Sequence, residues 1–292
     1  MASKRQTARW GEKMQNKLLL IILDGVPLKN WDLFGNLEGW VDAGEARKWR
    51  MRSVLPSTSA SCYASIHTGV APAIHGVTGN DNTFKVQQPD IFGQVRASGG
   101  VTGAVTHSYW SEFFNRAPFD PVRDLEYDEP DSASINHGRF HSMTGYGMIN
   151  QMTPSDADLF ATLTMLTERF DLNYGILHTC TLDSLGHRFR HDCYEMDNAI
   201  FHLDEKLAQY LIRWRAAGYE VIVTADHGQN DRGHHGGRSP EQQDFALYYF
   251  GSAEGVAIET LLDQRQLAPT VLTRLGSKVP DTMKHESFLA AP

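Results

Sequence analysis

The sequence predicts an α/β protein, a three-layer α/β/α sandwich around a mostly parallel central sheet. Short, nearly continuous apolar runs alternate with segments of helical spacing from one end of the chain to the other. Such runs are typical of strands that are buried on both faces, as parallel strands are. With 41% hydrophobic and 21% charged residues, the composition excludes a disordered chain and a coiled coil. We expect a single domain over residues 1–292.

The expected strands are the β-rich runs Leu18–Leu23, Val101–Thr106, Tyr174–Thr181, Val221–Thr224 and Phe245–Phe250. The spacing of apolar residues predicts helices over Ser61–Thr68, Asp156–Phe170 and Asp197–Ala217. The last helix has the clearest apolar stripe, and Gly218 follows it as a typical terminator. Strands that alternate with helices favour parallel pairing, because each crossover returns the chain to the same end of the sheet.

Residues 109–154 interrupt this alternation, because they are rich in aromatic, Gly, Pro, Asp and Asn residues and lack a clear period. A structureless loop of that length is uncommon inside a compact domain, so we expect a small cap inserted over the edge of the sheet. A surface excursion is the alternative. This segment also holds aromatic candidates for stacking on a flat substrate group, with local packing as their alternative role: Trp110, Phe113, Phe114 and Tyr146.

Charge and composition exclude several partners. Lys and Arg number 27 against 35 Asp and Glu, and the net charge of −8 favours neither a nucleic-acid polymer nor an anionic membrane surface. Three cysteines are too few for a disulfide framework. We find neither an apolar run of roughly 18 residues nor a secretory signal, and therefore expect no membrane association and a cytoplasmic location. The oligomeric state stays open.

Three of the expected strands run into an aspartate, at Asp24, Asp183 and Asp226. In an open parallel sheet, ligands bind beyond the carboxyl ends of the strands. Each aspartate alone is typical of a turn or a helix cap. Three carboxylates at one edge repel one another unless a cation lies among them, so together they indicate a metal site.

Histidines accompany two of these acids. One lies four residues after an aspartate in Asp-Ser-Leu-Gly-His, a second follows an aspartate in Asp-His-Gly, and a third lies in the loop Gly-His-His-Gly-Gly. A lone histidine is more often a hydrogen-bonded core or surface residue. Nitrogen and oxygen donors in this number suit two divalent cations, Zn²⁺ or, at a more open site, Mn²⁺. The candidate ligands are Asp24, Asp183, His187, Asp226, His227 and His235.

A hydroxyl-rich segment, Pro56–Ser61, leads into an expected helix. The backbone N–H groups and the positive end of the helix dipole would favour a phosphoryl group beside a serine at this position. A divalent cation on the serine oxygen would make it a nucleophile near neutral pH. The simpler interpretation is an N-cap accompanied by further serines.

In combination these motifs resemble the alkaline phosphatase superfamily, and within it the type I phosphodiesterase/nucleotide pyrophosphatase family. The shared motifs are Leu-Asp-Gly, Pro-Ser-x-Ser followed by Thr-Gly, Asp-Ser-x-Gly-His, Ala-Asp-His-Gly and His-Gly-Gly. The resemblance runs from Leu18 to about Leu275 apart from the expected cap, and Leu267–Gly276 resembles the closing helix of the family. It implies the alkaline phosphatase-like fold and a metal-dependent phosphoric ester hydrolase.

The resemblance also implies roles for single residues. The nucleophile position falls on Ser59, and Asn80 matches an asparagine whose amide contacts a phosphate oxygen; a plain turn residue is the alternative for Asn80. We assign His235 rather than His234 as a ligand, because it directly precedes Gly-Gly. The implied ligands are, for one ion, Asp183, His187 and His235, and for the other, Asp24, Asp226, His227 and the oxygen of Ser59.

Some positions depart from the family pattern. Ser59 stands where the diesterases usually have threonine and the alkaline phosphatases have serine, and Ala60–Tyr63 replaces the usual Phe-Pro-Asn-His. The run Arg188–His191 replaces a Gly-Pro segment, and either contacts a second anionic group or forms a solvated face. The formylglycine motif of sulfatases is absent around Ser59. The wall that faces the substrate is therefore expected to differ from that of the diesterases.

We therefore expect a hydrolase of small phosphoesters, with nucleotides among the candidates, that forms a phosphoseryl intermediate at two divalent metal ions. A phosphodiester or nucleotide pyrophosphate is the first expected substrate. A phosphomonoester or phosphonate is the alternative, favoured by the serine nucleophile. Transfer of the phosphoryl group to an alcohol shares the first half-reaction. A non-catalytic metal-binding domain is a further alternative, which the complete set of ligands disfavours.

Overall fold

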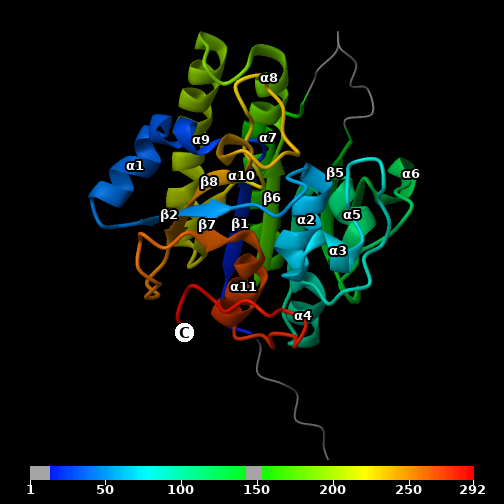
Figure 1. Ribbon diagram of the computed structural model, residues 1–292. Helices are drawn as coiled ribbons and strands as arrows, with labels where there is room; N and C mark the ends of the chain where they lie inside the picture. The colour runs from blue at the N-terminus through cyan, green and yellow to red at the C-terminus, as the bar shows by residue number, and fades with distance from the viewer. Residues whose placement is uncertain (1–13, 143–152) are drawn as a thin grey trace, which may run out of the picture.

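The computed structural model describes residues 14–142 and 153–292, in which nine strands form one sheet (Figure 1). Their order is β4-β5-β3-β6-β1-β7-β8-β2-β9. The strands are β1 Leu18–Leu23, β2 Arg47–Arg52, β3 Thr102–His107, β4 Glu126–Asp128, β5 His137–His141, β6 Tyr174–Thr179, β7 Glu220–Thr224, β8 Asp244–Phe250 and β9 Leu262–Asp263. The run from β5 to β7 is parallel throughout, whereas β4 and β8 lie antiparallel to their neighbours. The predicted mostly parallel sheet is confirmed.

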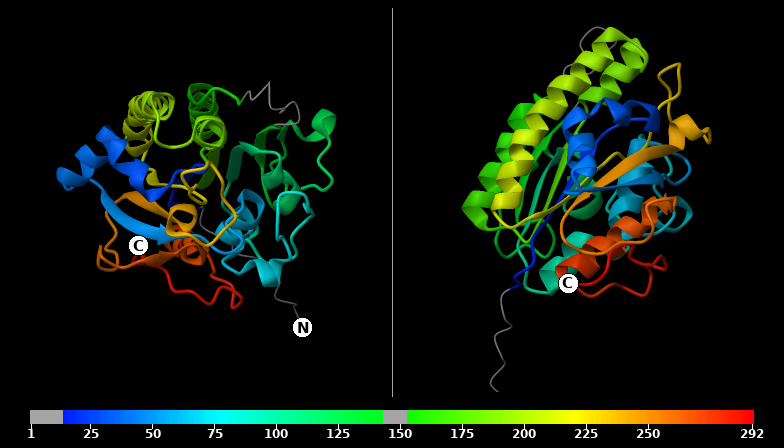
Figure 2. Two further views of the ribbon diagram at one scale, coloured as in Figure 1. Left: turned by 45° about the horizontal axis from the view of Figure 1, so that its top comes forward. Right: turned by 90° about the vertical axis from the view of Figure 1, so that its left-hand side faces the viewer.

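Helices cover both faces of the sheet and complete the three layers (Figure 2). One face carries α7 Asp156–Phe170, α9 Tyr194–Ala216 and, packed on α9, α8 Thr181–Phe189 and α1 Gly35–Asp42. The other face carries α2 Ser59–Thr68, α4 Ile91–Ala97, α5 Tyr109–Phe114 and α11 Leu267–Leu275. The short helices are α3 Pro72–His75, α6 Pro121–Asp124, α10 Pro240–Gln243, η1 Leu28–Leu33 and η2 Gln264–Gln266.

The central strands form where the apolar runs predict them. β1 spans the predicted residues, and all six of its side chains are buried, because β6 and β7 flank it and helices cover both faces. β6 ends at Thr179, two residues before the predicted end, since α8 already begins at Thr181. α2 begins at Ser59 rather than Ser61, which makes Ser59 the first residue of a helix.

The segment 109–154, expected to form a cap, contributes strands to the sheet instead of only covering its edge. β5 pairs in parallel with β3, and β4 pairs with β5 at the margin of the sheet. The described part of this segment therefore extends the sheet sideways. Residues 143–152, and with them Tyr146, lie outside the described residues.

The predicted stacking residues of this segment pack inside the protein. Trp110, Phe113 and Phe114 are all buried in the main hydrophobic core. Trp110 stacks on Tyr63 of α2, with 5.1 Å between ring centroids. Local packing is therefore the role of these three aromatic residues.

Among residues 14–142 and 153–292, no helix combines the length and the apolar character needed to cross a membrane.

Candidate active site

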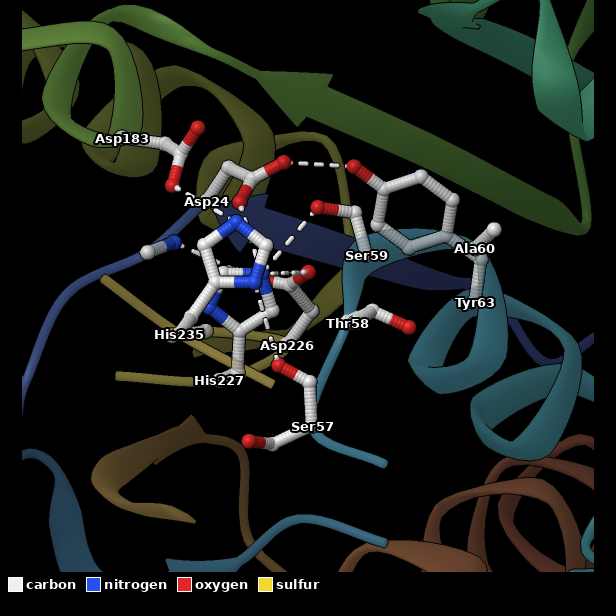
Figure 3. A network of polar contacts seen from close by, with 12 residues as sticks. Asp24, Ser57, Thr58, Ser59, Ala60, Tyr63, Asp183, Asp226, His227 and His235 are labelled. Carbon is white, nitrogen blue, oxygen red and sulfur yellow. Dashed lines mark hydrogen bonds and ion pairs between the residues drawn. The ribbon is translucent and has the colours of Figure 1, made fainter. Parts of the chain in front are cut away.

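The three predicted aspartates meet at one edge of the sheet (Figure 3). Asp24 directly follows β1, Asp183 lies in the first turn of α8 just after β6, and Asp226 lies two residues beyond β7. Because β6, β1 and β7 are adjacent parallel strands, their ends bring the three carboxylates side by side. Asp24 and Asp226 are almost fully buried there, at 3% and 0% exposure.

Two imidazoles lie beside Asp183. His187 Nε2 is 3.3 Å from Asp183 Oδ2, and His235 Nε2 is 3.9 Å from Asp183 Oδ1. Ligand atoms of the three residues all lie within 4.8 Å of one another, which is close enough to share one metal ion. His234, in contrast, is exposed. The structure thus brings together the three residues that the resemblance implies for one ion.

The buried His227 lies between the other two acids. Its Nε2 is 3.2 Å from Asp226 Oδ2 and 3.5 Å from Asp24 Oδ1. Ligand atoms of Asp24, Asp183 and His227 form a second group within 4.8 Å. This second group differs from the implied ligand set, because it contains Asp183 in place of Asp226. Asp183 therefore belongs to both groups, whereas Asp226 contacts His227 of the second group.

Ser59 opens α2 beside this cluster. The preceding residue, Thr58, is extended, and the chain turns into the helix at Ser59. Ser59 Oγ lies 3.1 Å from His227 Nε2. The backbone N–H of Ala60 donates to Asn80 Oδ1 over 3.0 Å. Because the carbonyl oxygen of Asn80 accepts this bond, its amide nitrogen can donate to a ligand in the cavity that the side chain lines. The first turn of α2 therefore places both the serine and the asparagine at the acidic edge.

Steric constraints explain why a glycine follows Asp24. Gly25 has a φ of +74°, and a Cβ there would lie 2.6 Å from Asp183 Oδ1. Its backbone N–H donates to Asp226 Oδ1 over 3.2 Å. Only glycine permits this close approach of three segments, which explains the Leu-Asp-Gly motif.

The charges of the neighbouring carboxylates and imidazoles shift the pKa values of the buried aspartates. Burial, together with the charges of Asp24 and Asp183, raises the pKa of Asp226 well above its usual range. Burial alone would also raise the pKa of Asp24, but the hydrogen bond and charge of His178, with the charge of His227, hold that pKa below its usual range. An ionised Asp226 at this buried edge would therefore require compensation by positive charge.

The residues present fit divalent cations. Asp24 Oδ1 and Asp226 Oδ2 are buried and have no hydrogen-bond partner. A buried carboxylate oxygen without a donor is costly, and a bound cation would satisfy both oxygens. The nearby donors are imidazole nitrogens and carboxylate oxygens, which suit Zn²⁺ or Mn²⁺. The site thus has the chemistry that two divalent cations require.

Several residues that hydrogen-bond to the candidate ligands were not predicted from the sequence. The Tyr63 hydroxyl donates to Asp24 Oδ2 over 2.5 Å, and His178 Nε2 lies 2.9 Å from the same oxygen. The amide of Gln229 donates to Asp183 and also contacts the buried His191. Tyr63 stands four residues after Ser59 on α2, and this helical spacing is the one signal that could have found it. The other side chains carry no local pattern that marks them.

The cluster lines one wall of a cavity of about 350 Å³. Asn80, His107, Tyr109, Cys180 and Ser184 line the remainder. Tyr109 is half-buried, and its hydroxyl donates to the backbone oxygen of Asn80 over 3.1 Å. Of the aromatic residues in the segment 109–154, Tyr109, the residue next to the predicted Trp110, therefore lines the cavity.

The cationic run after His187 faces solvent in part. Arg188 and Arg190 are exposed, and His191 is buried with its Nε2 2.7 Å from Gln229 Oε1. The two arginines thus form a solvated face, whereas His191 supports the loop that holds Gln229.

Comparisons with known proteins identify the family. The sequence pattern of the Type I phosphodiesterase / nucleotide pyrophosphatase family matches residues 18–238. GPI ethanolamine phosphate transferase 2 of Kluyveromyces lactis is 24% identical over an alignment of 252 residues that covers 80% of this chain and 28% of that protein. The chain therefore spans less than a third of this relative.

Solved structures share the fold. Murine ectonucleotide pyrophosphatase / phosphodiesterase 5 matches with a TM-score of 0.66 and 13% identity, over 94% of this chain and 100% of that chain. Phosphonate monoester hydrolase from Silicibacter pomeroyi matches with a TM-score of 0.58 and 14% identity, over 94% and 76%. The family match covers the acidic edge from Asp24 to His235. The chain belongs to the type I phosphodiesterase/nucleotide pyrophosphatase family.

Proposed function

We propose that this chain is a metal-dependent hydrolase of phosphodiesters or nucleotide pyrophosphates in which Ser59 is the nucleophile. The position of Ser59 carries the proposal. Its hydroxyl lies at the N-terminus of α2, 3.1 Å from His227 Nε2, in the wall of the cavity that Asp24 and Asp183 also line. Membership of the family supports the class of reaction.

The proposed function includes two divalent cations, with Zn²⁺ expected and Mn²⁺ as the alternative. When bound, the cations supply Lewis-acid chemistry that lowers the pKa of the serine hydroxyl and offsets charge on the phosphoryl oxygens. The residues that would hold them are Asp183, His187 and His235 for one, and Asp24, Asp226, His227 and Ser59 Oγ for the other.

The side chains of the protein account for the course of the reaction. Ser59 Oγ attacks phosphorus and forms an Oγ–P bond, while the bond from phosphorus to the leaving oxygen breaks. The amide nitrogen of Asn80 donates to a non-bridging phosphoryl oxygen, because the carbonyl oxygen of this amide is held by Ala60 N–H. The N-terminus of α2 favours the same negative charge. Water then breaks the Oγ–P bond, which releases the product and restores Ser59.

The cavity leaves room for more than a phosphoryl group. Its volume of about 350 Å³ lies in the range of small-molecule sites. Tyr109 offers a flat surface beside Asn80, which suits a nucleobase or another planar group. This supports a diester or a nucleotide as substrate. A phosphomonoester or phosphonate remains the alternative, since Ser59 stands where the diesterases usually have threonine.

A second candidate is transfer of the phosphoryl group to an alcohol. The similarity to a protein named GPI ethanolamine phosphate transferase 2 favours it. Both reactions share the first half, in which Ser59 takes up the phosphoryl group. They differ in the acceptor that releases it, which is water in hydrolysis and an alcohol in transfer.

Substitution of the nucleophile tests the proposal directly. Ser59→Ala removes the attacking oxygen, so kcat for a chromogenic diester should fall at least about 1,000-fold. Ser61→Ala is the matched control on the same helix, because Ser61 is buried and contacts the Thr58 hydroxyl at 2.9 Å rather than the cavity. Turnover and bound metal are measured together. Wild-type turnover by Ser59→Ala with its metal retained would contradict the assignment.

A pair of chromogenic substrates separates the substrate classes. We expect kcat/KM for bis-p-nitrophenyl phosphate to exceed that for p-nitrophenyl phosphate at least about 10-fold, because the binding of the second ester group stabilises the transition state. The measurement is initial-rate kinetics with both esters on one preparation. A preference for the monoester would reject the diester proposal in favour of the alternative.

Product analysis separates hydrolysis from transfer. With a diester and added ethanolamine or glycerol, a hydrolase should yield the same products as without the alcohol. We expect no new phosphoester of the acceptor, as measured by ³¹P NMR. A product that contains the added alcohol, and that Ser59→Ala does not form, would establish transfer instead.

Removal of a supporting hydroxyl tests the metal site. Tyr63→Phe deprives Asp24 Oδ2 of a donor, so the affinity for Zn²⁺ should fall about 10- to 100-fold. Tyr219→Phe is the control, since it removes a buried tyrosine hydroxyl that donates to the backbone oxygen of Leu172, away from the cavity. Affinity is measured by competition with a chromophoric chelator. Equal loss in both variants would show that Tyr63 acts on stability alone.

A further inference from the structure

One histidine at the cavity has no part in the steps proposed for hydrolysis. His107 is the last residue of β3, which pairs with β6 on the side away from β1. It lines the cavity, although only 9% of the residue is exposed. The parallel strands therefore place this imidazole at the same edge of the sheet as the carboxylates, one strand beyond Asp183.

Neighbouring groups fix the orientation and the proton of the His107 ring. The backbone N–H of Tyr109 donates to His107 Nδ1 over 3.3 Å, so Nδ1 acts as the acceptor and carries no proton. The Tyr109 ring packs edge-on against the imidazole, with 4.3 Å between centroids, and the ring of His141 lies beyond at 5.9 Å. Burial lowers the pKa of His107 to about 4, which keeps the ring neutral near pH 7. The proton of the neutral ring is therefore on Nε2.

This Nε2–H is a donor that the protein itself does not use. Within the part of the chain that the structure describes, the ring forms its hydrogen bond through Nδ1 alone. Ser184 also lines the cavity, and its buried Oγ has no hydrogen-bond partner among the described residues. A desolvated polar group without a partner costs free energy, which a ligand in the cavity can recover. The two side chains thus offer one N–H donor and one hydroxyl that donates or accepts.

The lining of the cavity also limits the charge of the group that these side chains can bind. Neither a lysine nor an arginine is among the described residues that line it. A second phosphoryl group, as in a pyrophosphate, is commonly bound by such cations. A neutral hydroxyl, in contrast, accepts from His107 Nε2 and donates to Ser184 Oγ. The lining therefore favours a diester with a hydroxyl-bearing group over a pyrophosphate.

The surroundings of Asn80 indicate which part of the substrate meets His107. In an in-line displacement, the leaving oxygen departs on the side opposite the attacking Ser59. Asn80 Oδ1 accepts from the backbone N–H of Ala60, the residue after Ser59, and the backbone oxygen of Asn80 accepts from the Tyr109 hydroxyl. Tyr109 and His107 thus adjoin the side of the nucleophile. The ester group on this side is the one that stays on phosphorus.

We propose that His107 is a specificity-determining residue that donates from Nε2 to a hydroxyl oxygen of the ester group that stays on phosphorus. This inference rests on the proposed function and narrows its substrate to a phosphodiester of a polyol, such as glycerol or a sugar. Tyr109 suits the same class, because its ring offers an apolar surface to the carbon skeleton. Ser184 supplies the acceptor for the proton of the same hydroxyl.

A pair of isosteric diesters tests the hydrogen bond. In 2-methoxyethyl p-nitrophenyl phosphate an ether oxygen replaces one CH₂ of butyl p-nitrophenyl phosphate, and this oxygen accepts as a hydroxyl does but cannot attack phosphorus. We expect the wild-type kcat/KM to favour the methoxyethyl ester about 10-fold, because a donor built to meet an oxygen rejects an analogue without one. His107→Phe should abolish this preference. His107→Gln should retain part of it, because its amide N–H can replace Nε2–H.

His141→Gln is the matched control, because His141 also ends a strand and neighbours His107 but is not among the residues that line the cavity. It should keep the wild-type preference. Thermal unfolding checks that each variant folds. If His107→Phe does not fold, His107→Ala replaces it, since it removes the donor and adds no bulk. Equal kcat/KM for the two esters in the wild type, or a preference that survives loss of the donor, would overturn the proposal.

Binding separates this inference from the proposed function. Calorimetry compares the affinities of the metal-loaded protein for 2-methoxyethyl phosphate and butyl phosphate and requires no turnover. We expect the same preference for the oxygen and the same loss in His107→Phe. A wild type that hydrolyses neither diester but keeps this preference in binding would refute the proposed function alone. Hydrolysis of both diesters at equal rates would refute the role of His107 alone, and absence of both hydrolysis and preference would refute both.

Discussion

Three carboxylates buried at one edge of a sheet are the constraint on which this site depends. Asp24, Asp183 and Asp226 repel one another where little water can screen them. Histidines supply part of the compensation, and two carboxylate oxygens still lack a donor. An edge of this kind is stable only if positive charge joins it. The backbone N–H of Gly25 and the side chains of Tyr63 and Gln229 donate hydrogen bonds to the acids and hold them in place against their mutual repulsion.

The topology of the sheet produces this convergence. β1 lies between β6 and β7 in the middle of the sheet, so the ends of three parallel strands meet although they are far apart in the sequence. The nucleophile comes from outside the sheet, on the first turn of α2, which covers one face. The rigid strands thus position the acids, and a helix N-terminus positions the hydroxyl with its favourable dipole.

The sequence predicts those parts of the fold whose signal is local. The buried central strands and the long helices α7 and α9 have strong periodic patterns, and they form within a few residues of prediction. β2 was not predicted, because it lacks a continuous apolar run: Arg47–Arg52 alternates charged residues with the buried Trp49 and Met51. Such alternation is compatible with its position beside the antiparallel strand β8. β5 is short and polar, and its pairing with β3 and β4 makes it a strand. Such pairing joins distant segments and leaves no mark in either one.

The same distinction separates the site residues that could be predicted from those that could not. Acids and histidines in spaced motifs were recognisable, and the structure gathers them. His178 and Cys180 sit at the end of an ordinary apolar strand, and His141 ends a strand with no apolar run. They become neighbours because β5, β3 and β6 are parallel and end at the same edge. The ends of the parallel strands therefore gather the carboxylates and imidazoles of the candidate site on one side of Asp24, and His178, Cys180 and His141 on the other.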